Sequence, residues 1–229
     1  MRAFVVGNGP SLKRTNLHHL TGEVSFACNN IHMIYPYTDW RPTYYVRSED
    51  ARLLERDDWL ESMQAHLDLG CEIYCNDYFF DSRFGLRETE KAHILSSCTH
   101  HLRHFDHPEC PHLWHLPVLC TFGSSVNVAV QIAHQQGYSP VYLVGCDLGY
   151  EDGKPSHFDA RYEHGREQSA RYANLDTLSA HMIAARSGAQ VYNATLGGSL
   201  EVYERVDYEN IFSGQRRESE THTPAFADR

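Results

Sequence analysis

The stretch VVGNGPSLKRT, residues Val5–Thr15, runs from an apolar segment directly into two glycines, a proline and small polar residues. An apolar run such as AFVV, residues 3–6, is typical of a strand buried on both faces of a parallel sheet. Gly7 and Gly9 would let the backbone approach a ligand and permit positive φ, and the exposed N–H groups of such a turn can bind an anion. Asn8 and Ser11 add short hydrogen-bonding side chains. The stretch predicts a strand that ends in a phosphate-binding loop, with a tight turn that holds no ligand as the alternative.

Further apolar runs and amphipathic segments alternate along the chain. We expect strands at 2–6, 24–28, 42–46, 71–75, 141–144 and from 190. We expect helices at about 51–67, about 124–136 and 168–187. This alternation predicts an α/β Rossmann-like fold, with a mostly parallel sheet and helices on both faces. We expect one nucleotide-binding domain over 1–214, an irregular lid insertion at about 76–117, and a disordered tail at 215–229.

The composition excludes several classes of protein. The chain has 229 residues and a formal net charge of −10, which argues against binding to nucleic acid or to an anionic membrane surface. No apolar stretch approaches the roughly 20 residues that a membrane span needs, and no secretory signal pattern is present at the start. Seven cysteines, several of them in apolar runs, favour buried free thiols and a cytoplasmic location.

Polar residues follow several of the predicted strands, where parallel sheets bind their ligands. Besides the first loop, these are Asn29 and Asn30, the segment 48–50, Gly145 and Asp147, and the segment 193–195. The third glycine of the dinucleotide-binding fingerprint is replaced by Leu12, and no acidic residue ends the second strand. No Gly-Lys-Ser/Thr follows either, so a nicotinamide enzyme and a P-loop kinase both fit poorly.

Four segments together, VVGNGPSLK, FACNN, GSSVNVAVQIAHQQGYSPVYLVGCDLGY and HFD, resemble the family-42 bacterial sialyltransferases. They also resemble the related superfamily that contains the 6-hydroxymethylpterin diphosphokinase-like proteins. The similar blocks cover roughly residues 1–50 and 118–200.

The resemblance implies a transferase whose substrate is a CMP-activated acidic sugar and whose acceptor is a hydroxyl of a glycan or small alcohol. It places the first loop, with Asn8, Gly9 and Ser11, around the phosphate and ribose, and the asparagines after the second strand near the nucleotide or sugar. Ser124 and Ser125, at the start of a helix, would hold a carboxylate or phosphate. The full set of expected nucleotide-binding residues is Gly7, Asn8, Gly9, Ser11, Asn29, Asn30, Ser124, Ser125, Gly145, Asp147 and Tyr150.

The catalytic base departs from the family pattern. The family's basic histidine falls near Arg171, so the resemblance alone supplies no base. His157 and His164 lie nearby in the sequence, and either imidazole could take the acceptor hydroxyl's proton near neutral pH. Tyr150 and Tyr162 stand where the family has tyrosines in this loop. No metal ligand and no firm cofactor are expected for this reaction.

Three other interpretations stay open. A diphosphokinase would need Mg²⁺, which Asp50, Asp147, Glu151 and Asp152 could hold. A non-catalytic nucleotide-binding module inside a larger envelope-polysaccharide assembly would use the same loop without turnover. In each interpretation the protein could form an oligomer. The histidines between 100 and 115, with Cys110, are either part of a polar lid or a structural metal site.

Overall fold

The computed structural model describes residues 1–48, 57–76, 92–97, 118–119, 124–149, 151, 154–163, 181 and 188–215. The strands are β1 (Ala3–Val6), β2 (Ser25–Cys28), β3 (Tyr44–Arg47), β4 (Glu72–Asn76), β5 (Ala92–Ser97), β6 (Val118–Leu119), β7 (Val141–Val144), β8 (Val191–Asn193) and β9 (Glu204–Arg205). The α-helices are α1 (Asp57–Asp68) and α2 (Ser125–Gln135), and 3₁₀ helices cover Pro10–Arg14, Leu17–Leu20, Asn29–Tyr37, Ala160–Glu163 and Glu209–Gln215.

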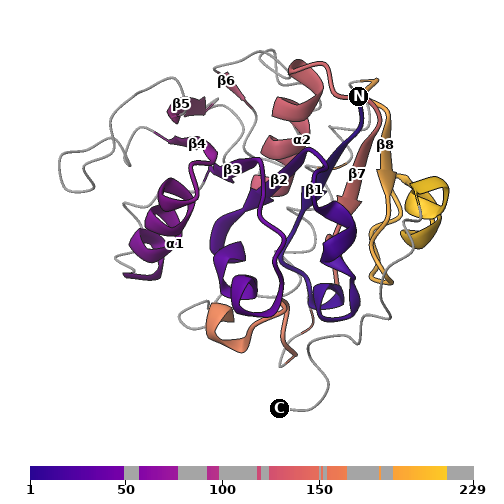
Figure 1. The fold of residues 1–229 in the computed structure, drawn as a ribbon, viewed down its shortest axis with the longest axis horizontal. Coiled ribbons are helices and arrows are strands. Elements are labelled where there is room, and N and C mark those ends of the chain that lie inside the picture. The colour runs from indigo at the N-terminus through magenta and orange to yellow at the C-terminus, as the bar shows by residue number, and fades with distance from the viewer. Residues whose placement is uncertain are drawn as a thin grey trace.

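Within these residues the strands form one sheet in the order β6-β5-β4-β3-β2-β1-β7-β8-β9, and every neighbouring pair is parallel. The chain therefore moves outward from β1 to β6 and then returns to β7 on the other side of β1 (Figure 1). Phe4 in β1 is paired with Ser25 on one side and Tyr142 on the other. The α/β fold is confirmed, and β1 and β7 mark the point where the strand order reverses.

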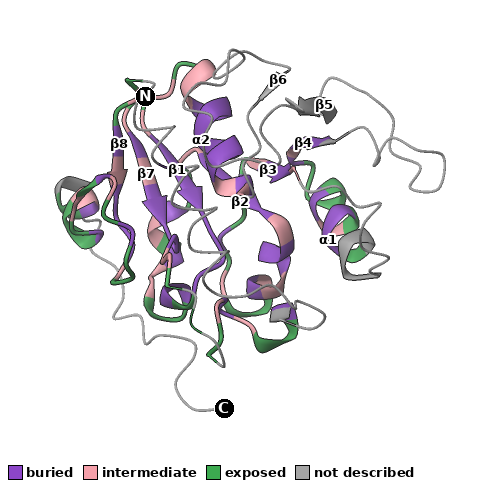
Figure 2. Cartoon of the chain, turned by 180° about the vertical axis from the view of Figure 1, so that it is seen from behind, coloured by how far each residue is buried: buried purple, intermediate pink, exposed green. Residues whose placement is uncertain are grey.

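Alternate residues of β1 pack into different cores, because successive side chains in a strand point to opposite faces. Phe4 and Val6 belong to the core under the 3₁₀ helices, together with Trp40 and Tyr208. Ala3 and Val5 belong to the core that α2 covers. All of β1 is buried as a result, as the central strands in Figure 2 show.

The expected strands are confirmed, with ends that differ by one or two residues. Between β1 and β2 the chain forms two 3₁₀ helices, Pro10–Arg14 and Leu17–Leu20. β5 lies inside the segment expected to be an irregular lid, and it pairs with β4, so this part extends the sheet. Most of that segment lies outside the described residues. The same is true of the helix expected at 168–187, apart from the helical residue His181, and of the tail from 216.

The described residues contain no helix that is both long and apolar enough to cross a bilayer. The four cysteines in this part of the chain, Cys28, Cys71, Cys75 and Cys146, are buried thiols, as expected.

Candidate functional site

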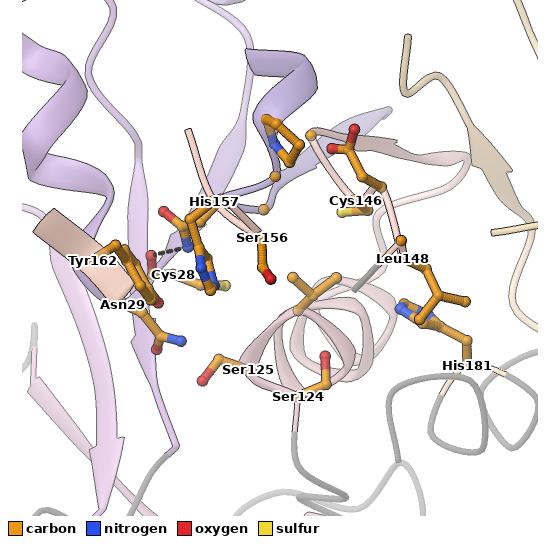
Figure 3. A pocket seen from close by; sticks show the side chains of 18 residues that line it. Cys28, Asn29, Ser124, Ser125, Cys146, Leu148, Ser156, His157, Tyr162 and His181 are labelled. Carbon is orange, nitrogen blue, oxygen red and sulfur yellow. Dashed lines mark hydrogen bonds between the residues drawn. The ribbon is translucent and has the colours of Figure 1, made fainter. Parts of the chain in front are cut away.

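A pocket lies beyond the carboxyl ends of β1, β2 and β7, where the strand order reverses and where parallel sheets bind ligands (Figure 3). Its volume is about 750 Å³, including space open to solvent at its mouth. Asn29, His157 and Tyr162 stand on one side, Leu148 and His181 on the opposite side, and the start of α2 lies between them. The lining residues are Gly7, Asn8, Gly9, Pro10, Cys28, Asn29, Ser124, Ser125, Val126, Gly145, Cys146, Asp147, Leu148, Gly149, Ser156, His157, Tyr162 and His181.

The glycines of the first loop bring the ends of β1 and β7 together. The N–H groups of Gly7 and Gly9 donate to the carbonyls of Val144 and Gly145, each at 2.8 Å. A Cβ on Gly7 would lie 2.6 Å from the Gly145 oxygen, and one on Gly9 would lie 1.9 Å from a carboxylate oxygen of Asp147. Neither glycine uses the positive φ that its type permits, since Gly9 has φ −68° and Gly7 is not among the positive-φ glycines. These glycines are needed for contact with the neighbouring strand end.

Ser11 and Asp147, both expected to face the nucleotide, bind each other. The Ser11 hydroxyl donates to one carboxylate oxygen of Asp147 at 2.7 Å, and the Ser11 N–H donates to the other at 3.2 Å. Burial raises the pKa of Asp147, and the bonds from Ser11 oppose this shift. Asp147 lines the pocket but Ser11 does not, so Ser11 supports the loop from behind.

Asn8 links three segments at the floor of the pocket. Its side-chain Nδ2 donates to the carbonyl of Cys28 at 2.9 Å, and its own carbonyl accepts the N–H of Phe158 at 2.9 Å. Asn8 is only 9% exposed, and no hydrogen bond reaches its Oδ1 within the described part of the chain. A buried acceptor without a partner is uncommon in a folded protein and fits a group that a ligand satisfies.

Two non-glycine residues among those described have positive φ, and both line the pocket. Asn29 has φ 54° and Leu148 has φ 46°. Such conformations are unfavourable for residues with a Cβ, and they concentrate at functional sites. Asn30 was expected to bind the nucleotide, but it does not line the pocket. It is buried, and its Oδ1 accepts a hydrogen bond from Arg47 at 3.2 Å.

The expected serine pair stands at the start of α2. Ser124 is the N-cap residue but its side chain makes no capping hydrogen bond. The Ser125 hydroxyl lies 2.9 Å from that of Ser48, at the end of β3. The N-terminus of α2 therefore presents backbone N–H groups and the Ser124 hydroxyl to the pocket, which suits an anionic group.

Of the two histidines expected as the base, the structure places His157 in the pocket. Its ring stacks on Tyr162, with centroids 3.8 Å apart and an interplanar angle of 13°. His157 is buried, and the next residue, Phe158, is bonded to Asn8. His164 and Tyr150 lie outside the described residues.

His181 lines the pocket but was not among the expected site residues. In the sequence it is one polar residue of the amphipathic helix expected at 168–187. Tyr203 donates its hydroxyl to the His181 carbonyl at 3.2 Å, and its oxygen lies 3.1 Å from Nδ1. Because that hydroxyl proton goes to the carbonyl, Nδ1 is the donor in the second contact and carries the proton. Burial lowers the pKa of His181 to about 4, so the imidazole is neutral at neutral pH.

The described residues hold no group of three side chains suited to bind a metal ion. Glu151 is exposed and forms an ion pair with Lys154 at 2.5 Å. Asp50, Asp152 and the histidines between 100 and 115 lie outside the described residues, so their expected roles stay predictions.

Neither family models nor curated proteins match the sequence. Two solved structures share the fold. The MAf glycosyltransferase from Magnetospirillum magneticum AMB-1 superposes with a TM-score of 0.56 at 15% identity, over 91% of this chain and 34% of that one. The sialyltransferase CstII from Campylobacter jejuni, solved with the substrate analogue cytidine-5′-monophosphate, superposes with a TM-score of 0.50 at 18% identity, over 90% of this chain and 85% of that one.

The protein therefore has a glycosyltransferase-like α/β fold with a pocket at its strand switch point. The chain spans about a third of the larger MAf structure and most of the CstII structure.

Proposed function

We propose that this protein is a glycosyltransferase that uses a nucleotide-activated sugar, and that its donor is a CMP-activated acidic sugar. The observation that carries the proposal is the chemistry of the described pocket lining. It offers amide, hydroxyl and backbone N–H groups but no lysine or arginine, and its one carboxylate, Asp147, is engaged by Ser11. A single phosphate and a sugar carboxylate can be held by neutral donors and a helix N-terminus.

The alternative, a Mg²⁺-dependent diphosphokinase, finds less support in this lining. A triphosphate with Mg²⁺ needs carboxylates for the metal and cations for the phosphates. No observation favours that alternative over the sugar transferase. A non-catalytic nucleotide-binding module would bind the nucleotide but would release no CMP from a CMP-activated sugar, which distinguishes it from the transferase.

In the proposed reaction His157 takes the proton of the acceptor hydroxyl as that oxygen attacks the anomeric carbon, and CMP leaves with the electron pair of the broken bond. Stacking on Tyr162 holds the imidazole plane in place. The α2 N-terminus, with Ser124, stabilises negative charge on the donor.

Binding is tested by calorimetric titration with CMP, CDP, UDP, AMP and ATP, each with and without Mg²⁺. We expect CMP to bind without metal, and Ser124→Ala to weaken its binding with little change in melting temperature, because the Ser124 side chain makes no capping bond. Ser139→Ala is the matched control. Ser139 is exposed, lies just before β7 and donates its hydroxyl to the Gln190 side chain. Binding of ATP alone, and only with Mg²⁺, would favour the diphosphokinase.

Catalysis is tested by release of CMP from a CMP-activated sugar. His157→Gln should lower kcat by about 10²–10⁴-fold, the usual contribution of a general base, while the dissociation constant for CMP changes little. An unchanged kcat in this variant would remove His157 from the reaction and leave His164 or His181 to be tested.

A further inference from the structure

The carbonyl oxygen of Asn29 is held by two buried hydroxyls behind the pocket. Tyr45 in β3 donates to it at 3.0 Å, and Ser62 in α1 donates to it at 2.7 Å. The two hydroxyl oxygens lie 2.9 Å apart, and Arg47 donates to the Tyr45 oxygen at 3.2 Å. Because Arg47 donates to the Tyr45 hydroxyl oxygen, the Tyr45 proton points away from Arg47, toward the Asn29 carbonyl and Ser62.

The preceding carbonyl is held from the other side. Asn8 donates its side-chain Nδ2 to the carbonyl of Cys28 at 2.9 Å. Two consecutive carbonyls, those of Cys28 and Asn29, are therefore each fixed by side chains of other segments. This arrangement determines the orientation of both peptide planes around Asn29, and Asn29 has φ 54° between them.

The two hydroxyls are themselves held rigidly. The ring of His66 stacks on Tyr45, with centroids 3.7 Å apart and an interplanar angle of 13°. His66 Nδ1 lies 2.6 Å from the carbonyl of Ser62, and its Nε2 lies 2.7 Å from the hydroxyl of Tyr35. A carbonyl only accepts, so Nδ1 carries the proton and Nε2 accepts from Tyr35. Tyr45, Ser62 and His66 are 0% exposed.

A polar network without solvent contact is costly unless every group is paired, and it then favours one conformation strongly. Here the network ends on the backbone of a pocket residue in a conformation that residues other than glycine rarely adopt. Tyr45 and Ser62 do not line the pocket, so they act on a ligand only through Asn29.

We propose that Tyr45 and Ser62 are positioning residues, which hold Asn29 in its left-handed conformation so that its amide faces the nucleotide donor. The proposal rests on the proposed function, because the ligand of Asn29 is taken to be the phosphate or sugar of that donor. Without the two hydroxyls, Asn29 relaxes toward negative φ and its amide turns away from the ligand.

The test compares Tyr45→Phe/Ser62→Ala with Tyr35→Phe. The control removes a buried hydroxyl from the same network, at the His66 end, and leaves both bonds to Asn29 in place. Calorimetric titration with CMP should show affinity about tenfold or more weaker in the double variant, which corresponds to the loss of one well-placed hydrogen bond. Tyr35→Phe should change the affinity by less than about twofold, even though it also removes a buried hydrogen bond.

A crystal structure of the double variant supplies a readout that needs no ligand. Asn29 at negative φ together with weaker CMP binding supports the proposal. Asn29 still at positive φ overturns it, as does an unchanged affinity for CMP. If the unaltered protein binds no CMP while Asn29 relaxes in the double variant, the network's control of Asn29 stands and the proposed function fails.

Discussion

Ser11 donates both its hydroxyl and its backbone N–H to the carboxylate of Asp147, at 2.7 and 3.2 Å, across a separation of 136 residues in the chain. This pair joins the loop after β1 to the loop after β7, and only Asp147 of the two lines the pocket. The pair also determines how the site responds to substitution and to pH.

Asp147→Asn and Asp147→Ala should differ in stability. Asparagine can still accept from the Ser11 N–H and can donate to the Ser11 hydroxyl oxygen, whereas alanine leaves both groups without a partner at a cost of about 1–3 kcal/mol. Burial raises the pKa of Asp147 above 3.8, so the folded state holds its proton to higher pH than the unfolded state does. The free energy of unfolding therefore falls as the pH rises from 3.8 through the raised pKa of Asp147. The asparagine variant has no carboxyl group to titrate and does not show this fall.

Urea unfolding at pH 7 checks this prediction. We expect Asp147→Asn to be at least as stable as the unaltered protein and Asp147→Ala to be less stable. Equal destabilisation in the two variants would show that the charge of Asp147 is itself stabilising.

Gly9→Ala should destabilise the fold, and Gly149→Ala should not. A Cβ at position 9 would lie 1.9 Å from Oδ2 and 2.7 Å from Cγ of Asp147, so the loop or the carboxylate must move. Overpacking of this kind costs about 1–3 kcal/mol. At position 149 the nearest atom to such a Cβ is the Ser199 hydroxyl oxygen, at an ordinary 3.9 Å. Melting temperatures of the two variants provide the measurement, and a tolerated Gly9→Ala would mean that the β1 and β7 loops can separate without loss.

Stability should fall as the pH drops below 6.5. Burial lowers the pKa of His66 from 6.5 to about 3 and that of His181 to about 4, so the unfolded state binds these protons first. Each histidine then lowers the free energy of unfolding by up to about 1.4 kcal/mol per pH unit until its folded pKa is reached.

Unfolding by urea between pH 7 and pH 5 tests this effect. His66→Gln should be less stable at pH 7 but should show a shallower dependence on pH. His18→Gln, at an exposed position, is the control and should keep the original slope. A slope that His66→Gln leaves unchanged would contradict the prediction.

The sheet was predictable because its inner strands are continuous apolar runs, such as those of β1 and β7, that end in polar or glycine residues. β5 was not predicted as a strand because Ala92–Ser97 lies among aromatic and histidine-rich residues that obscure its period. Its place in the sheet depends on pairing with β4, which is a tertiary effect.

The sequence could predict which residues reach the pocket edge but not how they pair. Ser11 and Asp147 both follow strands of a parallel sheet, which places them at one edge, but only the register of β1 against β7 brings them together. Asn30 and Asn29 are adjacent, and the left-handed turn at Asn29 sends one behind the pocket and the other to its wall. His181 gave no signal beyond its type, because the sequence does not tell which way its side chain points.

The reversal of strand order also affects how the protein is made. The loop after β1 leaves the ribosome well over a hundred residues before the end of β7, against which it packs. A nascent chain that stops before β7 carries the glycine loop and lacks its contacts with Val144 and Gly145. The pocket wall between the two loops therefore forms only after β7 has been made, while β8 and β9 still have to join the sheet.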